Sequence, residues 1–214
     1  FPRILESSSM FRTVLALALA LLAAPAVAFQ GPVRATHRGA MKMMAAKSAA
    51  IPFLPKPAEL DGSLIGDVGF DPLGVSDWMP LDYLRESELK HGRICMLAVT
   101  GFAATDLGFK LPGEQFNVAS ADAHNMAVSA GYMTVMGCAI FALECISGLA
   151  IQESLAGSGR AAGDYGLDPL KLSDKPDKMA DMQMKEITHA RLAMLAFSGM
   201  VTQAVLFDKG FPYF

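Results

Sequence analysis

Charge is scarce in this chain, and its two signs nearly balance. Only 18% of the 214 residues are charged, and the formal net charge is −3 at pH 7. Nucleic-acid binding needs a basic surface, so this composition argues against nucleic acid as a partner. Apolar residues instead make up 52% of the chain and the mean hydropathy is positive, which is unusual for a soluble domain.

Cysteine is scarce as well. The three cysteines, Cys95, Cys138 and Cys145, all lie in apolar stretches. Their odd number and their apolar surroundings argue against a disulfide framework, and we interpret them as small core residues.

Acidic residues are missing from a long segment near the N-terminus. After Met10 and Arg12, an apolar core at 14–24 and an Ala-Val-Ala site before Phe29 are typical of a signal peptide. The alternative, an extra membrane helix, is disfavoured because this core is too short to span a bilayer comfortably. The basic segment that follows resembles a transit peptide. We therefore expect upstream residues and a signal peptide at 1–28, a transit-like presequence at 29–47 and one folded domain at 48–214.

An internal repeat dominates the rest of the chain. Residues 88–98 read ELKHGRICMLA and residues 186–196 read EITHARLAMLA, so Glu, His, Arg, Met, Leu and Ala recur at one constant offset. A Gly-Asp-x-Gly-x-Asp-Pro-Leu segment precedes each copy, at 66–73 and at 163–170. Either loop alone would be a generic turn, but two copies at matching positions indicate a duplicated unit.

Three long apolar runs predict an all-α membrane protein. We expect helices at about 80–107, 121–152 and 178–207, each near the roughly 20 residues that cross a bilayer. Lys and Arg are more frequent before the first helix and between the second and third, so these two regions should share the positive side of the membrane. The first and third helices would then run in the same direction, crossed and related by a pseudo-twofold axis along the membrane normal.

The charged residues of the repeat need partners inside the membrane. An ionised Glu or Arg at the bilayer centre costs about 2.5–3.5 kcal/mol on insertion scales. Glu88 and Arg93 are five residues apart and poorly placed to pair within one helix. The pseudo-twofold instead predicts two bridges between helices, Glu88 with Arg191 and Glu186 with Arg93.

The Glu and His side chains three residues apart could be metal ligands or hydrogen-bonding partners. The plainer interpretation is a charge-paired helix dimer with core histidines, and the duplication weakens it. A bare Mg²⁺ site would want several oxygens in octahedral geometry, whereas magnesium already held by four ring nitrogens needs one axial ligand.

At these residues the chain resembles the light-harvesting chlorophyll-binding family, in particular its chlorophyll a/c branch. The resemblance covers roughly 52–214 and implies three membrane helices, with the first and third crossed and bridged by the Glu–Arg pairs. It implies that six residues are axial ligands to chlorophyll magnesium: Glu88, His91, Glu144, Glu186, His189 and Gln203. It assigns Arg93 and Arg191 to the ion pairs and, with them, to possible support of the ligands. For Glu144, a link to a neighbouring helix or backbone is the alternative to ligation.

The resemblance also gives the two Asp-Pro-Leu segments a role. In this family such segments receive the polar ends of two central carotenoids. The residues concerned are Phe70, Asp71, Pro72 and Leu73 in the first copy and Leu167, Asp168, Pro169 and Leu170 in the second.

The resemblance implies an antenna protein, not an enzyme, that passes excitation energy to a photosystem. Its cofactors would be chlorophyll a, chlorophyll c and a carotenoid of the peridinin or fucoxanthin type. Its partners would be other antenna subunits, photosystem I or II and thylakoid lipid. The two-part presequence fits a plastid of secondary endosymbiotic origin, and the N-terminus would be stromal. Two alternatives stay open: an energy-dissipating member of the same family, and a small membrane transporter or proton relay.

Overall fold

The computed structural model describes residues 47–168 and 176–213, with the side chains of 176 and 177 left out. The expected presequence and the pair Pro169 and Leu170 therefore lie outside the described residues. In chain order the elements are the short 3₁₀ helix η1 (Val75–Asp77), α2 (Leu81–Asp106), the 3₁₀ helix η2 (Glu114–Phe116), α3 (Ser120–Ser129), α4 (Tyr132–Leu155) and α5 (Pro176–Phe207). In these ranges the only β interaction is a single bridge between Lys47 and Pro55, so the described structure is helical.

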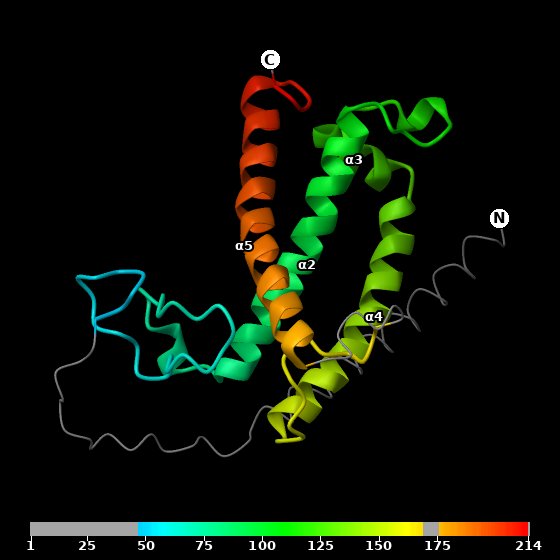
Figure 1. The fold of residues 1–214 in the computed structure, drawn as a ribbon. Helices are drawn as coiled ribbons and strands as arrows, with labels where there is room; N and C mark the ends of the chain where they lie inside the picture. Colours follow the sequence, from blue (N-terminus) through cyan, green and yellow to red (C-terminus); the bar gives the residue numbers. More distant parts are fainter. Residues whose placement is uncertain (1–46, 169–175, 214) are drawn as a thin grey trace. The chain divides into compact units, whose positions relative to one another are not determined.

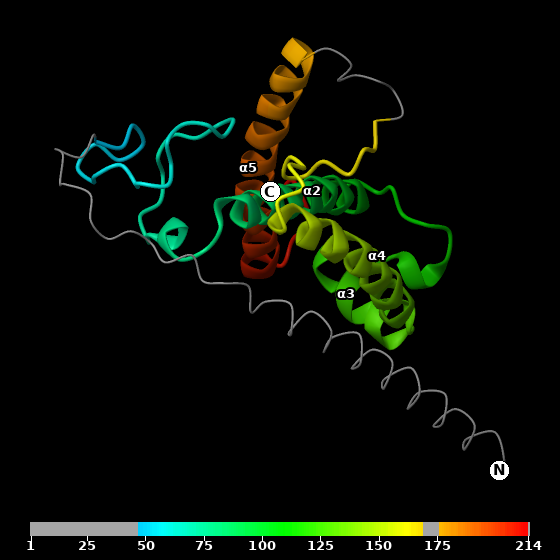
Figure 2. The same ribbon diagram turned by 90° about the horizontal axis from the view of Figure 1, so that it is seen from below.

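Helices α2 and α5 cross each other, as the two perpendicular views show (Figures 1 and 2). Their contact is close because small residues meet there: a Cβ built on Gly92 would lie 2.2 Å from the Cβ of Ala190. Ala190 is fully buried, and Leu89 and Ile187, three residues before Gly92 and Ala190, are buried as well. The absence of a side chain at Gly92 therefore allows the two backbones to approach.

The apolar run expected to form one helix at 121–152 is divided into α3 and α4. The break falls at Ala130 and Gly131, and Gly131 has a φ of 82°, in the left-handed region. Glycine adopts this conformation without the steric cost that other residues meet, so the chain can turn here between two helices. The apolar residues on both sides of Gly131 hide this break in the sequence.

Within the described ranges, two helices are long and apolar enough to cross a membrane. They are α4 and the Lys178–Phe207 part of α5, whereas the more highly charged α2 does not meet the same test of composition. No residue of α4 is buried inside the protein. Its large side chains Val135, Leu143, Ile146 and Leu149 are all exposed, as expected of a helix that faces lipid or bound pigment.

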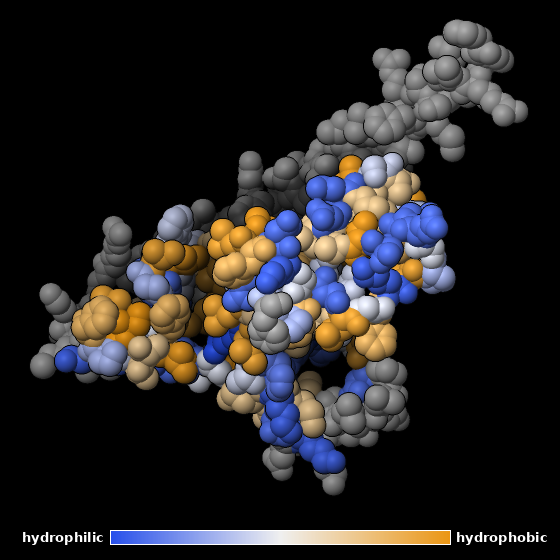
Figure 3. Space-filling view, turned by 90° about the horizontal axis from the view of Figure 1, so that it is seen from above, coloured by the Kyte–Doolittle hydropathy of each residue, from blue (hydrophilic) through white to orange (hydrophobic). Residues whose placement is uncertain are grey.

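Polar residues are most frequent near the helix ends and in the connecting loops. Figure 3 looks onto the end at which α5 finishes, and hydrophilic and hydrophobic residues are intermixed on this face. On this side Asp106, the last residue of α2, accepts hydrogen bonds from the Ser120 and Phe211 backbone amides at 3.0 and 2.9 Å. These bonds connect the end of α2 to the start of α3 and to the segment after α5.

Candidate functional site: charged pairs at the crossing of α2 and α5

Two ion pairs connect α2 and α5 where they cross. Arg191 Nε donates to Glu88 Oε1 at 2.8 Å, and Arg93 Nε donates to Glu186 Oε1 at 2.6 Å. Both bridges run between helices, as the repeat predicts. Each of the four side chains is partly exposed, so the pairs lie at the edge of the contact and not in a sealed core.

The two pairs are not equivalent. Glu88 has a second cation, because Arg85 Nη1 lies 3.0 Å from Glu88 Oε2 one helical turn earlier. The matching position before Glu186 holds Gln183, which carries no charge. Within the described residues, Glu186 Oε2 has no hydrogen-bond partner and Arg93 is the only basic side chain bound to Glu186. One carboxylate is thus held at both oxygens and the other at one.

His91 and His189 present the same geometry on the two helices. The Nδ1 atom of His91 lies 2.8 Å from the carbonyl oxygen of Ser87, and that of His189 lies 2.7 Å from the carbonyl oxygen of Lys185. A carbonyl can only accept, so the neutral ring donates from Nδ1 and keeps the lone pair on Nε2. Both histidines are exposed, so each offers an oriented nitrogen ligand on the outside of the crossed pair.

Glu144 on α4 contacts α2 directly. Lys90 Nζ lies 2.8 Å from Glu144 Oε2 and 2.8 Å from Ser147 Oγ. The link to a neighbouring helix, weighed above as the alternative to ligation, is therefore present. Sequence reasoning gave no role to Lys90, because a lysine beside the repeat histidine has no counterpart in the second copy, which has Thr188.

Gln203 lies on α5 beyond His189, and its side chain is exposed. Its amide makes no hydrogen bond to any of the described residues. An amide oxygen in this position is accessible from outside the protein.

The two approach loops each contact the opposite helix. In the first, the carbonyl oxygen of Gly66 accepts a hydrogen bond from Arg191 Nη1 at 2.8 Å, and a Cβ on Gly66 would meet Ile187 at 3.0 Å. In the second, a Cβ on Gly163 would meet Leu89 at 2.6 Å and Arg93 at 3.1 Å. Both glycines have positive φ, so two features favour glycine at each position.

The first Asp-Pro-Leu segment forms a closed turn around its carboxylate. Asp71 accepts hydrogen bonds from the backbone of Val75 at 3.0 Å and from the backbone and hydroxyl of Ser76 at 2.8 and 2.6 Å, which fixes the start of η1. Burial opposes ionisation of Asp71, but these hydrogen bonds outweigh it and lower its pKa. Phe70, Pro72 and Leu73 are exposed, so the turn presents an apolar edge.

The second Asp-Pro-Leu segment is described only as far as Asp168. Leu167 is 89% exposed and Asp168 is half-buried. The expected carotenoid contacts of Leu167, Asp168 and the two residues that follow stay predictions.

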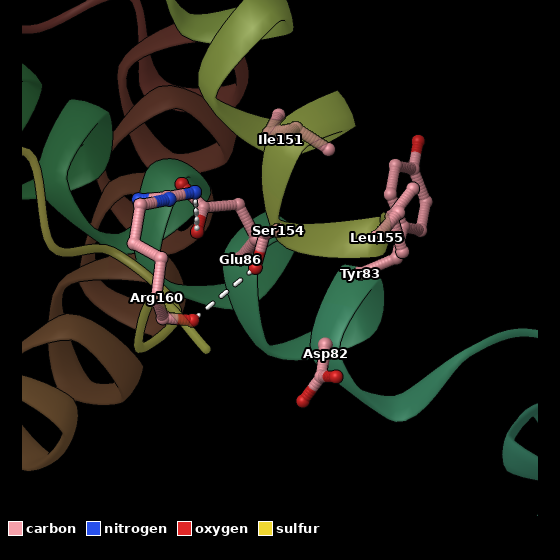
Figure 4. Close-up of a pocket in the computed structure, with 7 residues that line it drawn as sticks. All are labelled: Asp82, Tyr83, Glu86, Ile151, Ser154, Leu155 and Arg160. Atoms are coloured by element: carbon pink, nitrogen blue, oxygen red, sulfur yellow. Dashed lines mark hydrogen bonds and ion pairs between the residues drawn. The ribbon is translucent and has the colours of Figure 1, made fainter. Parts of the chain in front are cut away.

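A buried carboxylate that the sequence did not reveal, Glu86 of α2, binds the loop that precedes α5 (Figure 4). Glu86 is only 3% exposed, and its carboxylate accepts hydrogen bonds from Arg160 Nη2 at 3.1 Å, from the Gly163 amide at 2.6 Å and from the Tyr165 hydroxyl. Figure 4 also shows the hydroxyl of Ser154 bound to the backbone oxygen of Arg160. Burial and the hydrogen bond to Glu86 raise the pKa of Tyr165 to about 12.

The candidate ligands are dispersed. In the part of the chain that the structure describes, no three His, Cys, Asp or Glu side chains lie together as a bare metal ion would require. The side chains of His91, Glu144, Glu186, His189 and Gln203 can instead each offer one donor atom, from three helices, whereas both oxygens of Glu88 already bind arginine. This arrangement suits a metal that already has most of its ligands and needs one more.

The helical structure, the two candidate membrane helices and the crossed, charge-paired α2 and α5 define a class of helical protein built on a duplicated motif. A family model described as chlorophyll A-B binding protein matches residues 56–205. The match covers more than half of the chain, and the chain therefore belongs to the chlorophyll a-b binding protein family.

Curated relatives agree with this membership. The chain is 34% identical over 166 residues to chlorophyll a-b binding protein 6 of Arabidopsis thaliana, covering 72% of this chain and 66% of the relative. It is 32% identical over 203 residues to the fucoxanthin-chlorophyll a-c binding protein of Chattonella marina var. antiqua, covering 89% of this chain and 87% of the relative. It is 31% identical over 201 residues to photosystem I chlorophyll a/b-binding protein 5 of Arabidopsis thaliana, covering 83% and 78%. The chain thus spans about two thirds of the first of these relatives and more of the other two.

Proposed function

We propose that this chain is a light-harvesting antenna protein that binds chlorophyll and carotenoid and passes excitation energy to a photosystem. The observation that carries the proposal is the pair of like-placed Glu–Arg bridges at the α2–α5 crossing, each beside an exposed, oriented histidine. Membership of the chlorophyll a-b binding protein family and the names of the relatives support the same function. The role of the protein is to hold pigments at fixed distances and orientations, and the photochemistry belongs to the cofactors.

In this proposal α2, α4 and α5 all cross the membrane. The 26 residues of α2 give a length of about 39 Å at 1.5 Å per residue, which is sufficient. Its charges do not prevent insertion, because Arg93 and Glu88 have opposite charges from α5 beside them. Neutralised pairs avoid most of the cost of a lone charge in the bilayer.

The proposed fold has a pseudo-twofold axis through the crossing. Gly92 and Ala190 occupy equivalent positions of the repeat and face each other, as residues on such an axis would. The loop contacts of Gly66 with α5 and of Gly163 with α2 are equivalent too, and so are the two Glu–Arg pairs. Arg85, Lys90 and Glu86 lie outside the symmetry, because their counterparts are Gln183, Thr188 and Met184.

The donor set fits chlorophyll. Glu186 keeps one carboxylate oxygen without a partner among the described residues, and both histidines keep an outward Nε2 lone pair. We propose Glu88, His91, Glu186 and His189 as axial ligands of chlorophyll magnesium, with Gln203 and Glu144 as two more. Arg93 and Arg191 hold the carboxylates in place. Bound chlorophyll supplies the light absorption; these side chains bind and orient it.

The chlorophylls are proposed to be a and c, with a peridinin- or fucoxanthin-type carotenoid whose ends meet the two Asp-Pro-Leu segments. The similarity to the fucoxanthin-chlorophyll a-c binding protein supports this assignment. The proposed location is the thylakoid membrane of a plastid, with a stromal N-terminus behind a signal and transit presequence. Other antenna subunits, a photosystem and thylakoid lipid are the proposed partners.

Purification of the native protein in mild detergent tests the function. We expect a coloured protein whose extracted pigments include chlorophyll and carotenoid in fixed ratios to the polypeptide. Its fluorescence excitation spectrum should contain the carotenoid bands, because energy passes from carotenoid to chlorophyll. A colourless, folded protein would refute the antenna function and favour a transporter or proton relay.

A further inference from the structure

Glu144 is the only charged residue of α4 before Glu153, near the end of the helix. An isolated carboxylate on an apolar helix would be costly in the bilayer centre unless a counter-charge neutralised it. The structure supplies a counter-charge from another helix, because Lys90 Nζ of α2 lies 2.8 Å from Glu144 Oε2. The Ser147 hydroxyl, one turn further along α4, lies 2.8 Å from the same ammonium and 3.2 Å from the same carboxylate oxygen.

The carboxylate of Glu144 is held on one side only. Lys90 and Ser147 both bind Oε2, and Oε1 has no hydrogen-bond partner among the described residues. The Glu144 side chain is 50% exposed, so Oε1 is accessible from outside the protein. Glu186 has the same arrangement: a cation from a different helix binds one oxygen and leaves the other available.

We propose that Lys90 is a positioning residue for the pigment site proposed at Glu144 on α4: it neutralises Glu144 from α2 and leaves Oε1 directed outward as the ligand for the magnesium of a macrocycle. This inference rests on the proposed function and extends it to a residue outside the repeat symmetry. The ammonium and the carboxylate form a neutral pair, so the site needs no further ion. The same contact fixes α4 against α2, so the pigment on α4 is placed relative to those on the crossed pair.

The proposal predicts which variants lose the chlorophyll on α4 and which variant regains it. Lys90→Met keeps the length of the side chain and removes its charge, so Glu144 is left ionised without a cation. Glu144→Leu removes the ligand. In the double variant Lys90→Met/Glu144→Gln, a neutral amide oxygen replaces the carboxylate, and such a ligand needs no counter-charge.

Refolding the full chain with extracted chlorophyll and carotenoid, followed by pigment analysis, measures the outcome. Lys90→Met and Glu144→Leu should each lose one chlorophyll per polypeptide and give the same difference absorption spectrum. The double variant should regain that chlorophyll, with a shifted band because the ligand differs. Lys110→Met is the matched control, since Lys110 is an exposed loop lysine away from Glu144 whose ammonium donates to Asn117 Oδ1 at 3.1 Å. It should keep the full complement.

Several results would overturn the proposal. If Lys90→Met keeps every chlorophyll, Lys90 does not position the site. If the double variant fails to regain the pigment, the loss comes from helix packing and not from the stranded charge. If Glu144→Leu keeps every chlorophyll, Glu144 is not a ligand; the antenna function would survive this result as long as the unaltered chain binds pigment. An unaltered chain that binds none would refute the antenna function itself.

Discussion

The second cation on Glu88 predicts that its two arginines can substitute for each other. Arg191 binds one oxygen at 2.8 Å and Arg85 binds the other at 3.0 Å. Removing either one leaves the carboxylate neutralised, and removing both leaves it alone in an apolar environment. Arg85→Met and Arg191→Leu should therefore be strongly non-additive when combined.

The size of the coupling follows from the cost of leaving the Glu88 carboxylate without any cation. A lone carboxylate at the bilayer centre costs about 2.5–3.5 kcal/mol, and Glu88 is 28% exposed at the edge of the contact, so part of this cost is relieved. We expect a coupling free energy of about 1–2 kcal/mol, which is roughly a 5- to 30-fold change in the folding equilibrium. Arg191→Leu alone also loses the 2.8 Å hydrogen bond to the Gly66 carbonyl, but the double-mutant cycle cancels this contribution.

Reversible unfolding of the four proteins in mixed micelles of mild detergent and SDS, followed by circular dichroism, measures the coupling. Arg93→Leu is the comparison variant, because Glu186 has no second arginine and Gln183 stands where Arg85 would be. That single change should resemble the double variant at Glu88. Strict additivity of Arg85→Met and Arg191→Leu would refute the reasoning, since Arg85 would then contribute nothing to neutralising Glu88.

The remaining predictions concern the ligands, the crossing and the second loop. His91→Leu and His189→Leu should each remove one chlorophyll in pigment analysis while the helices remain folded, and unchanged pigment content in either would remove that residue from the ligand set. Gly92→Ala should destabilise the protein by about 1–3 kcal/mol in the SDS unfolding assay, because the new methyl would lie 2.2 Å from the Cβ of Ala190; a neutral effect would contradict the close crossing. Tyr165, with its pKa raised to about 12, should titrate at that pH in NMR of ¹³Cζ-tyrosine-labelled protein, with Tyr165→Phe assigning the signal. Because the folded state favours the neutral phenol, its stabilising effect should be complete below about pH 10 and lost as the pH rises through 12, and titration at the ordinary tyrosine value would refute the hydrogen bond.

The crossed pair could be predicted because it is duplicated. Glu88, Arg93 and their copies Glu186 and Arg191 stand in apolar runs where unpaired charges are costly. Glu and Arg are poorly placed to pair within one helix, so the constant offset predicts that each Glu pairs with the Arg of the other copy. The structure contains both bridges. The helical class was predictable from hydropathy alone. That three helices span the membrane, that a pseudo-twofold axis relates α2 to α5, and that the named residues bind pigment are still proposals.

The features that sequence reasoning missed are those without a second copy. Glu86 is one more acid at the start of a helix that has several, and its partners Arg160 and Tyr165 lie in a loop more than seventy residues away. Lys90 pairs with α4, a helix outside the repeat. The break at Gly131 depends on one backbone conformation inside an apolar run, and neither periodicity nor composition reports it.

The close crossing and the ion pairs depend on each other, because they occupy the same short stretch of each helix. Gly92 lies between Glu88 and Arg93, so the point of nearest approach falls between the two bridges. The 2.6 and 2.8 Å contacts require the backbones to stay close, and a larger residue at the crossing would lengthen both bridges together. A carboxylate released in this way would lose its counter-charge and its orientation at once. The residues that stabilise the crossed helices are therefore also the ones that fix the proposed ligands, so pigment binding and folding should respond in parallel to any change at this point.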